Sequence, residues 1–313
     1  MQKHVHLVGI LFATIFGFTF MFSKIAFVYV TPIGLIAYRF LLAFLVFEFL
    51  RRIKVIKVTL HKSNIKLLLL VAFFQPVSYF LFETFGLSRT SSSEAGMMIA
   101  LIPVFVTMLS ALILKEKPTW LQVGFIALSV SGVIYIQLSK SGEGLQVDIL
   151  GFSLLLAAVI SAALFNIASR NAGKTMKPQD VTYIMMLTGA VVFNIIYIIQ
   201  LSVEQRISDY VTNLFHLELV IPILYLGLAA SILAFFLVNY ALSRLPAHVT
   251  SIYANLSTIV AIIAGATILN ERLYFYHFIG SAMIIIGVYG TVLFSHKQKK
   301  KIQKPLNSKS LLK

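Results

Sequence analysis

The chain has 313 residues, with 26 Lys and Arg against 11 Asp and Glu, which gives a formal net charge of +15. Hydrophobic residues make up 59% of it, charged residues 12%, and its mean hydropathy is +0.91. Soluble proteins have roughly 45–50% apolar and about 25% charged residues, and disordered chains are less hydrophobic and more charged, so both classes are excluded. The absence of Cys excludes disulfides, thiolate metal sites and Cys nucleophiles. The composition is that of an integral membrane protein.

Ten apolar segments follow one another, each close to the roughly 20 residues that a helix needs to cross a bilayer. Their approximate bounds are 6–30, 32–50, 65–87, 91–114, 118–138, 150–170, 180–201, 219–242, 247–270 and 275–295. They are continuously apolar and do not alternate, so we predict an all-α fold with ten transmembrane helices and not a β-barrel. The first apolar run exceeds the about 7–15 residues of a signal peptide and no cleavage site follows it, so we expect it to remain as a helix.

Basic residues are shared unequally between the connections. With the N-terminus in the cytoplasm, the inner connections and the two ends hold 20 Lys and Arg, whereas the outer connections hold four. Those four are Arg89, Lys140, Arg206 and Arg272. Since cytoplasmic loops are enriched in Lys and Arg, we predict a multi-pass protein of the bacterial cytoplasmic membrane with both termini inside. On this topology Gly142 and Glu143 lie outside and Lys174 lies inside.

The basic tail, residues 296–313, contains His296-Lys297-Gln298-Lys299-Lys300-Lys301. It is interpreted as an anchor to anionic lipid on the cytoplasmic side and not as a nucleic-acid site. The expected partners are therefore the bilayer and a small-molecule substrate, with no nucleic acid. The sequence leaves open whether the chain is a monomer or a homodimer.

A weak internal repeat relates the two halves of the chain. A shift of 155 residues places Leu101 on Leu256 and Glu116 on Glu271. In each copy the Glu follows an apolar segment and stands beside a cation. The matched Glu residues indicate a duplication.

The duplication predicts two five-helix repeats, 1–140 and 141–295. Five is odd, so the second repeat enters the membrane from the opposite side. Inverted repeats of this kind are common in secondary transporters, in which the two halves exchange conformations to open the site alternately to each side. The alternative is a duplication in a purely structural membrane protein.

Small residues recur along one face of the ninth segment. They are Ala247, Ser251, Ala254, Thr258, Ala261 and Gly265. Gly280 and Gly287 continue this pattern in the tenth segment. Such faces allow helix backbones to approach closely, and sliding surfaces would have the same composition.

Several motifs resemble the EamA-type family of the drug/metabolite transporter superfamily. In the first half these are Phe16-Gly17-Phe18 through Ser23-Lys24, Pro32 with Arg39-Phe40-Leu41-Leu42-Ala43, and Ser91-Ser92-Ser93-Glu94-Ala95 through Pro103 to Glu116. In the second half they are Asn239-Tyr240-Ala241-Leu242 through Pro246-Ala247 to Glu271, Gly280 and Gly287. Thr258 replaces a Pro that is frequent in the second copy. The resemblance covers nearly the whole chain and implies ten helices in two inverted halves around a central cavity that moves small organic molecules, usually outward.

Three charged residues lie inside the predicted helices, where charge is costly and usually marks function. Lys24, Arg39 and Glu83 lie at similar depths, roughly 6–10 Å inside the outer ends of the first three segments at 1.5 Å per residue. One interpretation is a substrate site in which Glu83 or a substrate carboxylate or phosphate balances the cations. The others are snorkelling to the headgroups and a static ion pair.

Further site candidates are polar or helix-shaping. Aromatic side chains that share a helix face with Gln75, Asn166, Asn239 or Asn255 could line a pocket for an amphipathic ligand, and of these Asn239 and Asn255 are candidate substrate-binding residues. Structural or gating roles are assigned to Glu116 and Glu271, which the topology places at opposite faces. The same roles are assigned to Pro32, Pro103, Gly280 and Gly287.

An intramembrane enzyme is disfavoured, because all His and Asp residues fall in connections, tails or segment ends, so no catalytic or metal site can be assembled mid-membrane. No cofactor is expected, and the absence of a G-x-x-x-x-G-K-[ST] motif excludes an ATP-driven pump. We predict a secondary transporter that exports small metabolites, such as amino acids or amphipathic toxic compounds, by alternating access. A channel or a non-transporting partner subunit is the alternative.

Overall fold

The computed structural model describes residues 2–59, 64–114, 119–142, 148–251 and 253–308. Every secondary-structure element in this part of the chain is a helix. The elements are α1 (Gln2–Ala26), α2 (Pro32–Arg52), α3 (Ile65–Ala72), η2 (Phe73–Ser78), α4 (Tyr79–Arg89), α5 (Ser92–Ile99), α6 (Ile102–Leu114), α7 (Trp120–Gly142), α8 (Ile149–Ala172), α9 (Pro178–Val203), α10 (Asp209–Thr212), η3 (Asn213–Phe215), α11 (Leu217–Leu224), η4 (Tyr225–Ala234), α12 (Phe235–Arg244), α13 (Ala247–Ser251), α14 (Tyr253–Thr267) and α15 (Phe275–Ser308).

The helical segments are long and apolar. Within the described ranges, nine helices are long and apolar enough to cross a membrane, and a tenth apolar segment, Phe275–Thr291, is shorter. Large apolar side chains such as Phe215, Phe275 and Leu112 are exposed on the outside, as expected for a surface in contact with lipid. The prediction of an all-α membrane fold is confirmed, and the count of ten spans stays a prediction.

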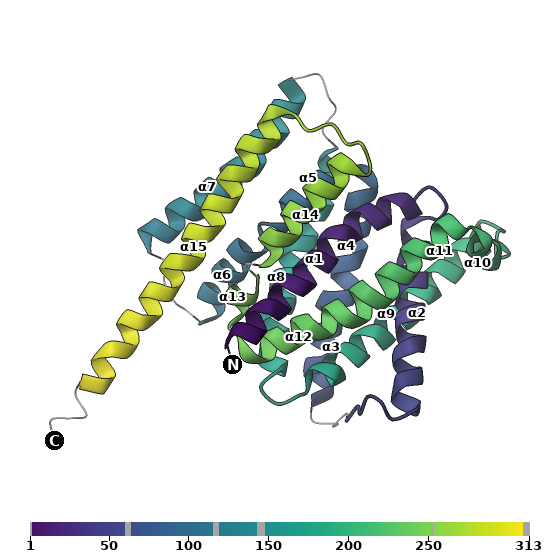
Figure 1. Ribbon diagram of the computed structural model, residues 1–313, viewed down its shortest axis with the longest axis horizontal. Coiled ribbons are helices and arrows are strands. Elements are labelled where there is room, and N and C mark those ends of the chain that lie inside the picture. The colour runs from purple at the N-terminus through teal and green to yellow at the C-terminus, as the bar shows by residue number, and fades with distance from the viewer. Residues whose placement is uncertain (1, 60–63, 115–118, 143–147, 252, 309–313) are drawn as a thin grey trace.

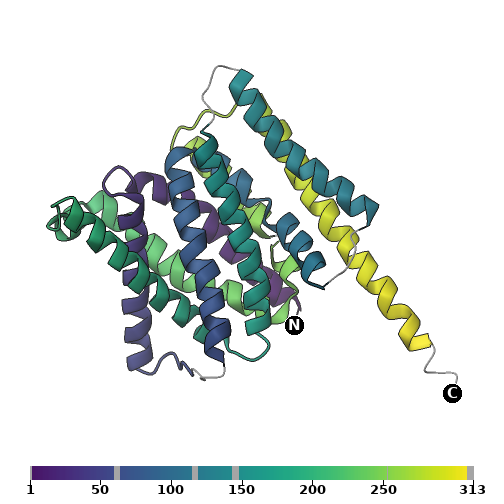
Figure 2. The same cartoon turned by 180° about the vertical axis from the view of Figure 1, so that it is seen from behind.

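Figure 1 shows both chain termini on the same side of the helix bundle, which we name the terminal face; the other side is the distal face. The pair α7 and α15 lies beside the main bundle in both views (Figures 1 and 2). These two helices pack so closely that a methyl group on Gly280 would lie only 2.9 Å from the carbonyl oxygen of Gly132. Gly287 packs in the same way against Phe125 and Ser129. The small residues thus set the distance between α7 and α15.

Helix starts follow ordinary capping chemistry. Thr31 caps α2 by accepting the N–H of Gly34 at 3.2 Å, and Pro32 occupies the first helical position. Asp148 caps α8 by accepting the N–H of Gly151 at 2.8 Å. That bond and the ion pair with Arg89 at 3.0 Å hold the pKa of the Asp148 carboxyl below its ordinary value. The pair lies between the end of α4 and the start of α8.

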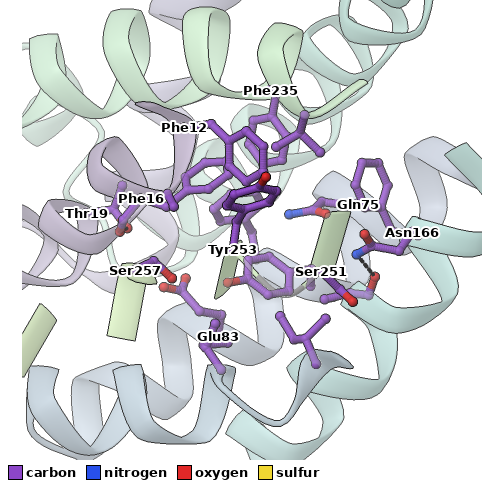
Figure 3. A pocket seen from close by; sticks show the side chains of 18 of the residues that line it. Phe12, Phe16, Thr19, Gln75, Glu83, Asn166, Phe235, Ser251, Tyr253 and Ser257 are labelled. Carbon is purple, nitrogen blue, oxygen red and sulfur yellow. Dashed lines mark hydrogen bonds between the residues drawn. The ribbon is translucent and has the colours of Figure 1, made fainter. Parts of the chain in front are cut away.

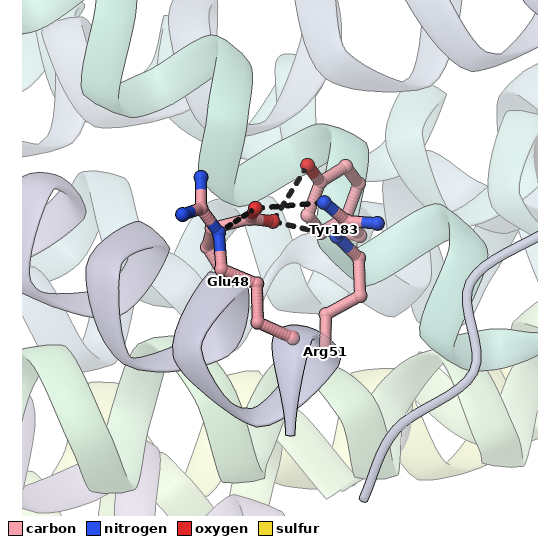
Figure 4. A network of polar contacts seen from close by, with 4 residues as sticks. Glu48, Arg51 and Tyr183 are labelled. Atoms are coloured by element: carbon pink, nitrogen blue, oxygen red, sulfur yellow. Dashed lines mark hydrogen bonds and ion pairs between the residues drawn. The ribbon is translucent and has the colours of Figure 1, made fainter. Parts of the chain in front are cut away.

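The end of α2 on the terminal face is held by a polar network (Figure 4). The carboxylate of Glu48 accepts hydrogen bonds from Arg51 Nε at 2.6 Å, Arg52 Nε at 2.8 Å and Tyr183 Oη at 3.1 Å. Tyr183 belongs to α9, so the network connects α9 to α2 and orders two of the basic residues that were used to predict the topology.

Two of the predicted spans are irregular where the sequence predicts uninterrupted helices: the third is kinked within η2, and the eighth contains the π-helical segment η4. In the third span, η2 separates α3 from α4, and Gln75 has extended backbone angles (φ −151°, ψ 116°) before Pro76. Because Pro lacks an N–H and crowds the preceding turn, a regular helix cannot continue there. In the eighth span, η4 separates α11 from α12. The shift of 155 residues places 73–78 on 228–233, inside η4, so both halves are distorted at the same place.

The fourth and ninth spans differ from each other. α5 ends at Ile99 and α6 begins at Ile102, with Pro103 as its second residue. In contrast, α14 runs without interruption through Thr258, the residue that replaces the usual Pro. Thr258 uses its hydroxyl to donate to the carbonyl of Gly96 at 2.6 Å. The absence of Pro therefore leaves α14 regular and adds a bond to α5.

α5 and α14 pack antiparallel. Gly96 faces Ala261, and earlier on α5 Ser92 faces Gly265, which is later on α14. The small-residue face of the ninth segment is thus the surface that receives α5. An antiparallel contact between helices from the two halves is the arrangement that an inverted repeat requires.

Candidate functional site

A cavity of about 90 Å³ lies at the centre of the bundle, between α1, α2, η2, α4, α8, α12 and the ends of α5, α6, α13 and α14. Figure 3 shows side chains from several of these helices converging on it. Its aromatic lining residues are Phe12, Phe16, Phe20, Tyr79, Phe80, Phe165, Phe235 and Tyr253. The aromatic walls suit the apolar part of a small organic ligand, because ligand sites are mainly apolar with a few placed polar groups.

Two aromatic residues that the repeat relates meet at the cavity. The shift of 155 residues places Phe80 on Phe235. Their rings lie edge to face with centroids 6.0 Å apart, and Phe235 also contacts Phe16 at 5.2 Å and Phe165 at 6.4 Å. The third and eighth spans therefore approach one another at the cavity, just after the kinked segment η2 and the π-helical segment η4.

Arg39 brings a positive charge to the cavity from α2. Arg39 is 3% exposed, and its Nε donates a hydrogen bond to Ser231 Oγ at 2.7 Å. Its guanidinium carbon lies 4.4 Å from the centroid of the Phe80 ring, a cation–π distance. Among the described residues no carboxylate lies within 4 Å of it, so its charge has no direct ionic partner. A snorkelling position is ruled out by this burial.

Glu83 brings a negative charge from α4. It is 5% exposed, and Figure 3 shows its side chain pointing into the cavity. Thr84 Oγ1 donates to its carboxylate at 3.1 Å. Arg39 and Glu83 interact electrostatically without forming an ion pair in the described structure. The cavity therefore holds one separated group of each sign.

Neutral polar groups complete the cavity lining. Gln75 projects from η2 and Asn166 from α8, and Asn166 donates to the carbonyl of Ala162 at 2.8 Å. Ser251 and Ser257 line the cavity from α13 and α14. These residues offer hydrogen bonds without adding charge. The sequence indicates Gln75 and Asn166, because aromatic side chains on the same helix faces could share a pocket with them, and both line the cavity.

The third charged candidate lies elsewhere. Lys24 does not line the cavity but is within electrostatic range of Glu94 and Glu271. The sequence placed Lys24 with Arg39 by depth alone, and depth does not say which way a helix face turns. The structure brings Arg39 and Glu83 together and puts Lys24 in a second cluster.

Glu271 is held at the distal face by the start of α5. Its carboxylate accepts from the backbone N–H of Ser92 at 2.7 Å and of Ser93 at 3.0 Å, and from their hydroxyls at 2.8 Å and 2.6 Å. A carboxylate at a helix N-terminus is favoured by the unpaired N–H groups and the helix dipole. Gly265 leaves space for the Glu271 carboxylate, since a methyl group at this position would lie 2.5 Å from Glu271 Oε2. We name this group, Glu271 with Ser92, Ser93 and Gly265, the distal clamp.

On the other side of the cavity, Tyr253 connects α14 to the start of α1. His6 Nδ1 and Tyr253 Oη are hydrogen-bonded at 2.6 Å, and the Tyr253 ring packs edge to face on Phe12 with centroids 5.6 Å apart. Gly9 permits this contact, since a side chain there would overlap the Tyr253 ring. The cavity thus lies between the distal clamp and the His6–Tyr253 contact. Neither His6 nor Tyr253 carried a signal that distinguishes it in the sequence.

The two Asn candidates do not line the cavity. The side chain of Asn239 is satisfied between helices: it accepts from Ser169 Oγ at 2.6 Å and donates to Thr182 Oγ1 at 2.9 Å. Asn255 Oδ1 is buried without a hydrogen-bond partner in the described part of the protein. Glu116 lies outside the described residues.

The profile of the EamA-like transporter family matches residues 4–138 and again residues 149–293. The uncharacterized transporter YcxC of Bacillus subtilis (strain 168) is 36% identical over 300 residues, 96% of this chain and 96% of YcxC. A probable amino-acid metabolite efflux pump of Escherichia coli (strain K12) is 27% identical over 297 residues, 92% of this chain and 95% of that protein.

A solved crystal structure of a protein with 14% sequence identity has a TM-score of 0.67 and covers 95% of this chain and 99% of that chain, which supports the fold. The family resemblance of the sequence motifs is confirmed by the profile, which spans both halves. The chain therefore belongs to the EamA-like transporter family.

Proposed function

We propose that this protein is a secondary transporter that exports small amphipathic metabolites, with amino acids as the leading class. The observation that carries the proposal is the central aromatic cavity with Arg39 and Glu83 buried and separated in its wall. A zwitterion fits this pair, because its carboxylate can bind the guanidinium and its ammonium can bind the carboxylate. The efflux-pump name of the Escherichia coli relative supports the same class.

The transport cycle that we propose is alternating access between two repeats, 1–140 and 141–295. The distal clamp closes one end of the cavity by joining α5 of the first repeat to the loop after α14 of the second. The His6–Tyr253 contact joins the repeats on the other side. Opening one contact while the other stays closed would expose the cavity to one side at a time.

For export, we place the terminal face in the cytoplasm of a bacterial cell, in agreement with the basic connections and tail. On this orientation the distal clamp is the outer gate. Substrate would enter while the His6–Tyr253 contact is open and leave when the distal clamp separates.

Counterflow in proteoliposomes tests this function. Vesicles loaded with unlabelled L-leucine or L-phenylalanine should accumulate the labelled amino acid from outside faster than empty vesicles. The reason is that a carrier with unlabelled amino acid bound returns its site to the outside, where it can take up the labelled amino acid. A channel gives no such acceleration. If no amino acid shows counterflow in vesicles that contain folded protein, amino acids are not the substrate class.

A further inference from the structure

The hydroxyl of Ser231 is the single hydrogen-bonding partner that the described structure gives to the Arg39 guanidinium. Ser231 is 0% exposed and comes from η4 in the second half of the chain, whereas Arg39 comes from α2 in the first half. The bond uses Nε and leaves the two terminal nitrogens without a hydrogen bond among the described residues. These two nitrogens form the fork with which Arg binds carboxylates in two-pronged fashion.

The Ser231 side chain is neutral, and this determines how much charge remains on the Arg39 guanidinium. An Asp or Glu at this position would neutralise the guanidinium within the protein and leave nothing for a ligand. A hydroxyl fixes the direction of the guanidinium plane and leaves its charge uncompensated. The Phe80 ring, 4.4 Å from the guanidinium carbon, supports the same plane without a full negative charge.

The backbone around Ser231 is shaped for this contact. Gly227, one turn earlier in η4, lets the segment lie directly on α2, because a methyl group there would be 3.2 Å from the carbonyl oxygen of Arg39 and 2.9 Å from Leu42. The π-helical turn is wider than an α-helical turn and is often found at functional sites. Gly227 and the π-turn together bring the Ser231 hydroxyl to Nε.

The other repeat shows that helix packing does not require this pair. The shift of 155 residues places Pro76 on Ser231. η2 packs against α9, as η4 packs against α2, and a methyl group on Gly189 in α9 would lie 3.1 Å from Pro76 Cγ. Counted from Pro32 and Pro178, which begin α2 and α9, Arg39 corresponds to the apolar Met185. The same corner of the fold is therefore built in one half without charge.

We propose that Ser231 is a positioning residue of an anion site: it holds Arg39 through Nε so that the terminal nitrogens grip a carboxylate of the transported molecule. This rests on the proposed function, of which it specifies the recognised group. Because the bond crosses between the two repeats, the grip is complete only while η4 and α2 are together. Relative movement of the repeats would release the guanidinium and weaken the binding of the carboxylate.

The test separates carboxylate binding from transport. Purified wild-type protein is heated with matched ligands, L-phenylalanine against phenethylamine and L-leucine against isoamylamine, each pair differing in the carboxylate. We expect the amino acids to raise the melting temperature more than the amines. In Ser231→Ala the dissociation constant of the amino acids should rise about tenfold or more, since a hydrogen bond to a charged group is lost, while that of the amines stays the same.

Conservative and control variants exclude a merely structural effect. Ser231→Thr should restore most of the amino-acid affinity. Ser231→Asp should fold, because it pairs with Arg39, but should lose amino-acid binding and keep amine binding. Ser129→Ala is the matched control: Ser129 is also 0% exposed and lies in α7, away from the cavity, where its hydroxyl donates within its own helix to Phe125 at 3.1 Å.

The outcomes decide between the proposals. Selective carboxylate binding that depends on Ser231, without counterflow, would keep the anion site and refute amino-acid transport. Suppose that amino acids show counterflow but bind no better than the amines, or that Ser231→Asp binds amino acids as well as the wild type does. Either result would refute the anion site and keep the transport function. If neither amino acid stabilises the wild-type protein, the anion-site proposal is overturned.

Discussion

Two carboxylates, the half-buried Glu271 and the buried Glu83, show how surroundings distinguish a fastening group from a cavity group. Glu271 accepts four hydrogen bonds from Ser92 and Ser93. Glu83 accepts one from Thr84, and it faces the cavity. A charge removed from water is stable only when its partners replace water, so Glu271 is satisfied by the start of α5, whereas for Glu83 we propose that a group entering the cavity completes its partners.

At Arg39, replacement by Lys keeps the charge and removes the fork and the Nε donor. We expect Arg39→Lys to lower transport of L-phenylalanine at least tenfold at normal protein levels, because an ammonium cannot reproduce two-pronged binding. Initial rates of counterflow measure this. Arg89→Lys is the control, since its ion pair with Asp148 is exposed and worth little. Equal transport by both variants would remove Arg39 from the site.

At Glu83, replacement by Gln fixes the group in a neutral form of the same shape. If Glu83 binds a proton and the substrate ammonium alternately during the cycle, the Glu83→Gln protein should reach normal levels in the membrane. Its transport rate should no longer vary with pH. Transport at a series of pH values checks this, with Glu218→Gln, an exposed residue at the start of α11, as the control. Loss of the protein from the membrane would instead show that the carboxylate of Glu83 has a structural role.

Among the helices, the order and approximate extent of the spans could be predicted from apolar length alone, but their interruptions could not. The change to π-helix in η4 has no Pro at its centre, and only comparison with η2 through the repeat indicates where it lies. The partners of Glu271 were missed because they depend on which helix ends meet in space. In the sequence each Glu of the repeat stands beside a cation, whereas in the structure the N-terminus of α5 holds Glu271. Sequence neighbours are poor predictors of such contacts between helices.

The distal clamp depends on the absence of a side chain at position 265. Gly265→Ala would place a methyl group 2.5 Å from Glu271 Oε2 and 2.7 Å from the hydroxyl of Ser92. The carboxylate must move, so we expect a loss of stability of about 1–3 kcal/mol, typical of overpacking. Thermal unfolding in detergent measures it. Gly124→Ala is the matched control, because nothing lies within 4 Å of a methyl group there, and it should melt at or above the wild-type temperature. Equal melting of both variants would show that the clamp is not formed.

In the whole molecule, the two halves share their framework but not their chemistry. Both have an irregular segment at the matching place, a kink in η2 and a π-segment in η4, and Phe80 and Phe235 occupy matching places at the cavity. Within the described part of the chain, the charged residues that line the cavity, Arg39 and Glu83, belong to the first half; the shift of 155 residues places Glu83 on the apolar Val238. The repeat could thus predict where a cavity forms, whereas the ligand is determined by residues that break the repeat. Burial of Arg39 and its bond to Ser231 could not be read from the sequence.

The orientation of the molecule in the membrane is the last prediction. The distribution of Lys and Arg predicts that the terminal face, with both termini, lies in the cytoplasm, so that Gly142 at the end of α7 lies outside and Lys174 inside. Because the chain has no Cys, single Cys variants can be labelled without removing native thiols. In intact cells an impermeant maleimide should label Gly142→Cys at once and Lys174→Cys only after lysis. The reverse pattern would place the distal clamp on the cytoplasmic side, and the same cavity would then have to be interpreted as loading from outside.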